Sequence, residues 1–264
     1  MALRASIGQY YSASSPLHRL DPRAKLAATV AFMASCFFVH TGAQLVLAAA
    51  AVLAAICAAH VPMGRLLSQI KPIALFLVVT SIVNLFFVQT GAVVAAWGPV
   101  SIHAGGVEAA VLYTARFFLL LLAGSLLMLT TTPAAITDAI ERVFAPLERL
   151  GVPVGQASTN LSIALRFVPT LSREAEHILA AQTARGADLE NKGALAYARA
   201  CVPLVVPLFS SALRHADNLG RAMDARCYMS GPARTHYHEL KLDVRRDGPF
   251  IALVAVYLGV LAIL

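Results

Sequence analysis

The chain has 264 residues, of which 58% are hydrophobic and 13% are charged, and its formal net charge at pH 7 is +7. Soluble globular domains average roughly 25% charged residues, so this composition excludes an ordinary soluble domain and indicates an integral membrane protein. Four cysteines lie apart without a paired spacing such as C-x-x-C, which argues against a disulfide framework or a cysteine metal site.

The first apolar stretch runs from residue 26 to residue 59 and is broken by polar residues around position 42. As one helix it would be about 51 Å long, which exceeds a hydrocarbon core of about 30 Å. The stretch therefore predicts a hairpin of two spans. Further spans are predicted at 72–89, 107–131 and 249–264.

Lysine and arginine predict the orientation, because retained positive charge marks the cytoplasmic side of a membrane protein. All of them except Arg116 lie before residue 26, between residues 65 and 71, or in the region 133–248. We therefore expect a multi-pass protein of the cell membrane. Its N-terminus and region 132–248 are expected in the cytoplasm, and its C-terminus outside.

Arg116 lies inside the fourth predicted span. An arginine at the centre of a membrane helix costs about 2.5 to 3.5 kcal/mol on insertion scales, so we expect it to face protein, a partner or a water-filled cleft. The alternative is a span that begins later, with Arg116 reaching the interface. No Asp or Glu lies in the core of a span, which disfavours a proton- or sodium-coupled pump.

Three amphipathic helices are predicted in the cytoplasmic region. The first covers residues 133–149, where Thr132 and Pro133 form a typical helix start. The second begins near Pro153, and its apolar stripe ends at Arg185, with Gly186 in the place of a C-terminal glycine. The third covers about residues 194–228, is expected to kink at its two prolines, and presents a stripe of small residues for close packing, namely Leu213, Ala216, Gly220, Met223 and Cys227.

These elements predict an all-α integral membrane protein with about five transmembrane helices and about three amphipathic helices between the fourth and fifth spans. The expected organisation has residues 1–131 as the N-terminal segment with spans one to four. Residues 132–248 form the cytoplasmic helical domain, and residues 249–264 form the last span.

Two of the amphipathic helices end on a similar signature, Ala184-Arg185-Gly186 and Ala225-Arg226-Cys227. A cation in the last turn of a helix complements the helix dipole and needs no further role. Two long helices that end alike favour docking instead, because small neighbours leave each guanidinium as a fork of donors for carboxylates or carbonyls.

The sequence lacks the motifs that are typical of nucleotide binding, catalysis and metal binding. It has neither a G-x-x-x-x-G-K-[ST] nor a G-x-G-x-x-G loop, and it has no recognisable catalytic constellation. His236 and His238 lie in a polar segment that reads as a solvated loop rather than a metal site. The basic charge is spread over membrane-proximal helices, so anionic lipid headgroups explain it better than nucleic acid.

Four stretches resemble the transmembrane T component of energy-coupling factor (ECF) importers of vitamins and metal ions, a branch of the ATP-binding-cassette (ABC) transporters. They are SSPLHRLDPRAKL (14–26), TTTPAAITDAIERVFAPLERLG (130–151), RFVPTLSREAEHILAAQTARG (166–186) and PLVVPLFSSALRHADNLGRAMDARCYMSG (203–231).

The resemblance implies that this chain is a non-catalytic energy-coupling subunit. Its two Ala-Arg motifs would dock on two cytoplasmic ATPase subunits, which bind ATP and Mg²⁺, while its spans would pack on a membrane substrate-binding S component. The chain itself would bind no cofactor. Two alternatives stay open, a conventional ABC permease that lines its own substrate path and a stand-alone membrane enzyme.

Cys227 departs from the resembled family, which has glycine after the second arginine. A left-handed backbone is less accessible to cysteine than to glycine. We therefore expect the third helix to continue through Cys227 to a cap near Gly231, and the two motifs to differ in geometry.

Overall fold

The computed structural model describes residue 11 and residues 15–97, 100–186, 194–229 and 243–264. These residues form two compact units, which are treated separately below. The span unit comprises the described residues up to Ala139 together with residues 243–264, and the paired-helix unit comprises residues 140–229.

The span unit is mostly helical. Its elements are η1 (Leu17–Arg19), α1 (Pro22–Cys36), α2 (Gly42–Ala59), α3 (Met63–Ile70), η2 (Lys71–Ile73), α4 (Ala74–Phe87), β1 (Val93–Trp97), β2 (Val100–His103), α5 (Ala104–Thr130), the start of α6 (Pro133–Phe144) and α9 (Val244–Ile263).

The predicted break in the first apolar stretch is confirmed, because α1 and α2 are separate helices. Thr41 and Gln44 form a capping box at the start of α2. The Thr41 hydroxyl accepts the Gln44 N–H at 3.4 Å, and the Gln44 side-chain oxygen accepts the Thr41 N–H at 3.1 Å. These bonds satisfy amides that a helix start leaves without partners.

Four helical segments of the described chain are long and apolar enough to cross a membrane, namely Gly42–Ala59, Met63–Phe87, Ala104–Thr130 and Arg245–Ile263. The remaining helix of the predicted set, α1, has 15 residues and is therefore about 22 Å long, shorter than a hydrocarbon core of about 30 Å. The chain is thus a membrane protein, while the count of five spans stays a prediction.

Two predicted bounds differ from the structure. The third span begins before Pro72, which lies in η2 inside the apolar run Met63–Phe87. The last helix begins at Val244 rather than Pro249, because the Asp243 side chain accepts the Arg245 N–H at 3.1 Å and caps α9.

The stretch between α4 and α5 carries an antiparallel pair of strands, β1 and β2, so this loop is not helical.

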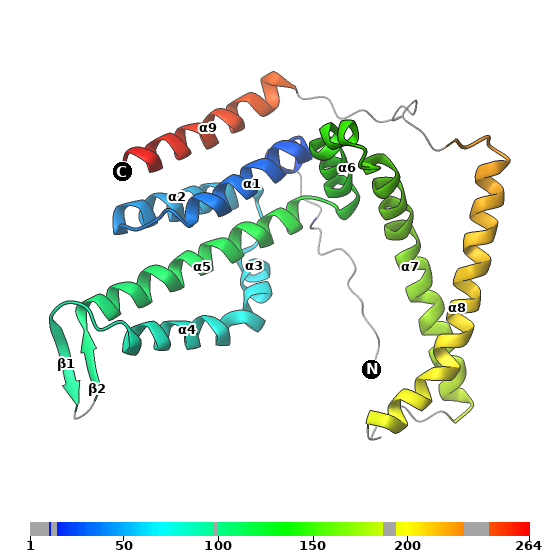
Figure 1. Ribbon diagram of the computed structural model, residues 1–264, viewed down its shortest axis with the longest axis horizontal. Coiled ribbons are helices and arrows are strands. Elements are labelled where there is room, and N and C mark those ends of the chain that lie inside the picture. The colour runs from blue at the N-terminus through cyan, green and yellow to red at the C-terminus, as the bar shows by residue number, and fades with distance from the viewer. Residues whose placement is uncertain (1–10, 12–14, 98–99, 187–193, 230–242) are drawn as a thin grey trace. The chain divides into compact units, whose positions relative to one another are not determined.

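Helix α5 is the centre of the span unit and packs against α1, α2, α3 and α4 (Figure 1). Buried leucines from its second half, Leu119, Leu122, Leu126 and Leu129, join the core formed with α2 and α3. The outer faces are apolar as well: Leu75 of α4 is 75% exposed and Phe87 81%. Exposed side chains of this kind suit contact with lipid tails.

The paired-helix unit contains the end of α6, η3 (Ala145–Leu150), α7 (Val154–Ala184) and α8 (Ala194–Asp224). The three predicted amphipathic segments are therefore helices. The predicted start at Thr132 is also confirmed, since its hydroxyl accepts the Ala135 N–H at 3.3 Å. Helix α8 contains Pro203 and Pro207, and its ribbon bends in its first part (Figure 1).

The face of α8 that meets α7 differs from the predicted one. Ser211 is buried and contacts Glu174 of α7, whereas Leu213, Ala216 and Gly220 of the predicted stripe are exposed. At these three positions the stripe is therefore not covered by a described part of this chain.

Candidate functional site

The first arginine motif lies at the end of α7. Ala184 is the last residue of the helix, Arg185 is its C-cap, and Gly186 has a φ of +85°. The Gly186 N–H donates to the Thr183 carbonyl at 3.0 Å, which closes the last turn. The predicted role of Gly186 as the helix-ending residue is confirmed.

The second motif also has a residue of positive φ directly after its arginine. Helix α8 ends at Asp224, and Cys227 has a φ of +55°. The Cys227 N–H donates to the Asp224 carbonyl at 2.9 Å and the Tyr228 N–H to the Met223 carbonyl at 3.0 Å. This pair of bonds is the Schellman motif, in which Ala225 and Arg226 occupy the positions before the left-handed residue.

The expectation that α8 continues through Cys227 to a cap near Gly231 is therefore wrong. A left-handed conformation costs a residue with a side chain about 1 to 2 kcal/mol. The two Schellman hydrogen bonds offset this cost, because they satisfy carbonyls at the helix end that would otherwise lack partners. The two motifs share a residue of positive φ after the arginine and the hydrogen bond from its N–H to the carbonyl three residues earlier, although one has glycine and the other cysteine.

Both guanidinium groups are available for a partner. Arg185 and Arg226 are exposed, and neither has a side-chain acceptor among the residues that the structure describes. Ala184 and Ala225, which precede them, are exposed too. As far as the described residues go, each motif thus presents a fork of donors without an acceptor, beside small side chains at the end of a long helix.

The helices α7 and α8 run in opposite directions, so the motifs lie at opposite ends of the pair (Figure 1). Glu174 of α7 contacts Ser211 of α8 near the middle. At a rise of about 1.5 Å per residue, Arg185 lies about 16 Å from Glu174 along the axis of α7. Arg226 lies about 22 Å from Ser211 along the axis of α8, in the opposite direction. The two arginines are therefore roughly 40 Å apart if both helices are straight beyond the contact.

A polar cluster joins α7 to α8. The Ser211 hydroxyl donates to the Glu174 carboxylate, and His215 Nε2 lies 3.5 Å from the other carboxylate oxygen. The ring of His215 also packs on Phe167, with 5.9 Å between the ring centroids. These contacts fix the register of the two helices and so the separation of the motifs. This cluster is not predictable from the sequence, because its members lie on two distant segments.

Arg116 lies in the middle of α5 and is 9% exposed. Its Nη2 donates to the carbonyl of Val39 in the turn after α1, and its Cζ lies 5.3 Å from the centroid of the Tyr113 ring. The expectation that this arginine faces protein is confirmed. It ties α5 to the α1–α2 hairpin, which is a structural contact.

A second feature that the sequence does not predict lies before α1. His18 Nε2 donates to the Tyr11 carbonyl at 2.9 Å, and its Nδ1 lies 2.6 Å from the Ser15 hydroxyl. Burial lowers the pKa of His18 below its ordinary value, which favours the neutral ring. The Tyr11 N–H in turn donates to the Leu129 carbonyl of α5 at 3.0 Å. This segment is thereby anchored to the span unit.

No group of three metal-ligating side chains gathers within the described residues. The His236–His238 pair lies outside them.

Comparison with known proteins identifies relatives of the whole chain. Residues 13–237 match the cobalt transport protein family, CbiQ. Energy-coupling factor transporter transmembrane proteins from Ruminiclostridium cellulolyticum and Heliobacterium modesticaldum are each 39% identical, over 89% and 96% of this chain and 88% and 95% of their own. A putative ABC transporter ATP-binding protein from Bifidobacterium longum is 44% identical over 94% of this chain, which spans only 32% of that relative's length.

Proposed function

The chain belongs to the cobalt transport protein family and is similar over most of its length to transmembrane proteins of energy-coupling factor transporters. From this premise we propose how it works. It transmits ATP-driven movement from two cytoplasmic ATPase subunits to a separate membrane subunit that holds a vitamin or a metal ion. ATP and Mg²⁺ are bound by the ATPases, and this chain contributes docking and movement rather than catalysis.

The observation that carries the proposal is the pair of equivalent arginine ends. Arg185 and Arg226 follow helices of 31 residues each, and both precede a residue with positive φ. Their separation of roughly 40 Å is too large for one small-molecule site, because such a site is a single pocket. Two like ends that point in opposite directions suit two copies of one kind of partner.

The nature of that partner follows from charge and from one relative. Exposed guanidinium groups bind carboxylates and carbonyls in a bidentate manner. The Bifidobacterium longum relative is named an ATP-binding protein, and this chain matches about a third of it. That relative supports an arrangement in which a chain of this kind works beside an ATP-binding region, here supplied by separate subunits.

Movement would pass along the paired helices. Closure of the two ATPases would displace the Arg185 and Arg226 ends, and the Glu174–Ser211 contact would make α7 and α8 move together. We place these helices in the cytoplasm, in accord with their positive charge. The substrate-binding subunit would lie against the spans.

Co-purification tests the proposal. The tagged chain is isolated from its native membrane, and the proteins that elute with it are identified by mass spectrometry. We expect two ATPase subunits and a membrane protein that binds the substrate. With Arg185→Ala and Arg226→Ala combined, the ATPases should be lost and the membrane protein retained.

The matched control combines Arg166→Ala with Arg214→Ala, because these arginines are exposed on the same two helices but several turns away from the motifs. That control should retain every subunit. Transport by the purified chain alone in vesicles would contradict the proposal and favour a permease that lines its own path.

A further inference from the structure

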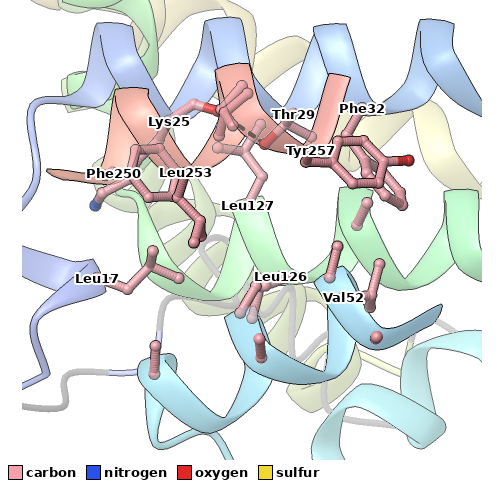
Figure 2. Close-up of a pocket in the computed structure, with 18 of the residues that line it drawn as sticks. Leu17, Lys25, Thr29, Phe32, Val52, Leu126, Leu127, Phe250, Leu253 and Tyr257 are labelled. Atoms are coloured by element: carbon pink, nitrogen blue, oxygen red, sulfur yellow. Dashed lines mark hydrogen bonds between the residues drawn. The ribbon is translucent and has the colours of Figure 1, made fainter. Parts of the chain in front are cut away.

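The span unit contains an apolar cavity of about 360 Å³ between α1, α2, α5 and α9 (Figure 2). Alanines of α2, including Ala51 and Ala55, form one wall, and Leu253 and Tyr257 of α9 form another. The volume falls within the range of about 300 to 1,000 Å³ typical of ligand pockets. The cavity lies wholly within one compact unit.

The hydroxyl groups on the cavity wall are already satisfied. Thr29 donates to the Lys25 carbonyl at 2.8 Å, and Thr130 donates to the Leu126 carbonyl at 2.8 Å. The Tyr257 hydroxyl lies 3.1 Å from that of Ser35. An ordered water needs two to four polar partners, which such a wall does not supply. The cavity is therefore suited to an apolar occupant.

Lys25 is the charged residue of the lining, and it is 5% exposed. Its Nζ donates to the His18 carbonyl at 3.2 Å and to the Thr130 carbonyl at 3.1 Å. An ammonium group has three donors, so one is left over. No carboxylate among the residues that the structure describes comes within 4.0 Å of this nitrogen.

Charged groups of both signs surround Lys25, and Arg246, Asp21 and Asp247 act on its ammonium group. Arg23 follows the start of α1, and Arg245 and Arg246 lie in the first turn of α9. Asp21 and Asp247 are buried nearby, but the Asp247 carboxylate accepts the backbone N–H groups of Asp21 and Asp243, each at 3.1 Å. The carboxylates of Asp21 and Asp247 thus accept backbone N–H groups at the starts of α1 and α9.

We propose that the cavity binds one acyl chain of an anionic phospholipid, with the lipid phosphate at Lys25. An acyl chain fills an apolar space between spans, and a phosphate oxygen accepts the remaining proton of the ammonium group. Basic pockets between membrane helices on the cytoplasmic side are typical sites for anionic headgroups. The site is independent of the docking role proposed for Arg185 and Arg226.

Quenching by brominated lipids tests this site in the full chain. Trp97 is the only tryptophan in the sequence, so it is replaced with Phe. A reporter is then introduced as Phe32→Trp on the cavity wall. The matched reporter, Phe87→Trp, replaces a side chain of α4 that is 81% exposed. Each protein is reconstituted in phosphatidylcholine vesicles with brominated phosphatidylglycerol or brominated phosphatidylcholine.

We expect half-maximal quenching at Phe32→Trp with severalfold less brominated phosphatidylglycerol than brominated phosphatidylcholine. At Phe87→Trp the two lipids should quench equally, because that face meets bulk lipid. Equal quenching by the two lipids at Phe32→Trp as well would overturn the proposal.

Three variants locate the lipid. Lys25→Gln should abolish the preference for phosphatidylglycerol, and Lys25→Arg should retain it. Ala51→Phe fills the cavity without touching Lys25, so it should reduce quenching of the cavity reporter by both lipids severalfold. Quenching that Ala51→Phe leaves unchanged would place the acyl chain outside the cavity and contradict the proposal even if Lys25→Gln fails to fold.

Discussion

Gly186 and Cys227 occupy the same backbone position, one residue after an arginine at the end of a 31-residue helix, with φ angles of +85° and +55°. The left-handed conformation is easy for glycine and unfavourable for cysteine. The structure nevertheless gives both arginines the same setting. Either glycine or cysteine after the arginine thus allows the arginine to lie at the helix end. With Cys227 the end of α8 is locally less stable.

Replacement of Cys227 with Gly should stabilise the end of α8 by at most about 1 kcal/mol, because relief of a left-handed cost of about 1 to 2 kcal/mol is partly offset by the backbone entropy that glycine loses on folding. The Tyr228 amide reports this effect, since it donates to the Met223 carbonyl only when the Schellman motif is formed. Its hydrogen exchange should slow by up to about fivefold. Gly186→Ala is the matched change at the other motif and should speed exchange there. Faster exchange at Tyr228 in Cys227→Gly would contradict this account.

Helix starts and stops were predictable where a local residue signals them. Thr132, Pro133 and Gly186 are such signals, and the structure places all three as expected. The end of α8 was not predictable in this way. The apolar spacing suggested that the helix runs on, whereas two backbone hydrogen bonds decide where it stops.

Contacts between segments that lie far apart in the chain could not be predicted from the sequence either. Glu174 and Ser211 meet only because α7 and α8 run in opposite directions, and nothing in either segment specifies its partner. The burial of Lys25 is likewise not predictable from its local sequence, which indicates only a positive charge on the cytoplasmic side. Arg116 was more predictable, because the cost of a charge in a membrane requires protein around it.

The start of α5 depends on glycine. A Cβ at Gly106 would lie 2.6 Å from the Leu85 carbonyl oxygen and 2.8 Å from that of Val88, so α4 could not approach as closely. We expect Gly106→Ala to destabilise the span unit by about 1 to 3 kcal/mol. Gly259→Ala is the matched control, since nothing lies within 4 Å of its added Cβ. Thermal unfolding midpoints in detergent should fall for Gly106→Ala alone, and equal midpoints would disprove the close contact.

Arg116→Leu should affect membrane insertion and the stability of the folded chain in opposite directions. Leucine removes the insertion cost of about 2.5 to 3.5 kcal/mol. The variant also loses the charge-assisted bond to the Val39 carbonyl, which is worth about 1.5 to 3 kcal/mol. We therefore expect normal or improved membrane insertion and a lower unfolding midpoint. Tyr113→Phe keeps a ring beside the guanidinium and should have little effect on either measurement. An unchanged midpoint in Arg116→Leu would show that the arginine has no structural role.

The orientation in the membrane is tested with single cysteines in a chain whose four native cysteines are replaced with Ala. Gln89→Cys lies after α4 and Glu176→Cys lies on α7, and both positions are exposed. We expect an impermeant maleimide to label Gln89→Cys in intact cells, and Glu176→Cys only after permeabilisation. Labelling of both from the same side would refute the orientation inferred from positive charge.

Arg185→Lys and Arg226→Lys test whether docking needs the shape of the guanidinium or only its charge. Lysine keeps the charge and the helix-dipole interaction but lacks the planar fork that binds a carboxylate bidentately. If the arginines dock on the ATPases, the double lysine variant should show transport and coupled ATP hydrolysis between those of the wild type and the double alanine variant. If they serve only the helix dipole, lysine should restore both activities fully. Wild-type transport in the double alanine variant would end the docking proposal, and normal amounts of inserted protein are needed as the control.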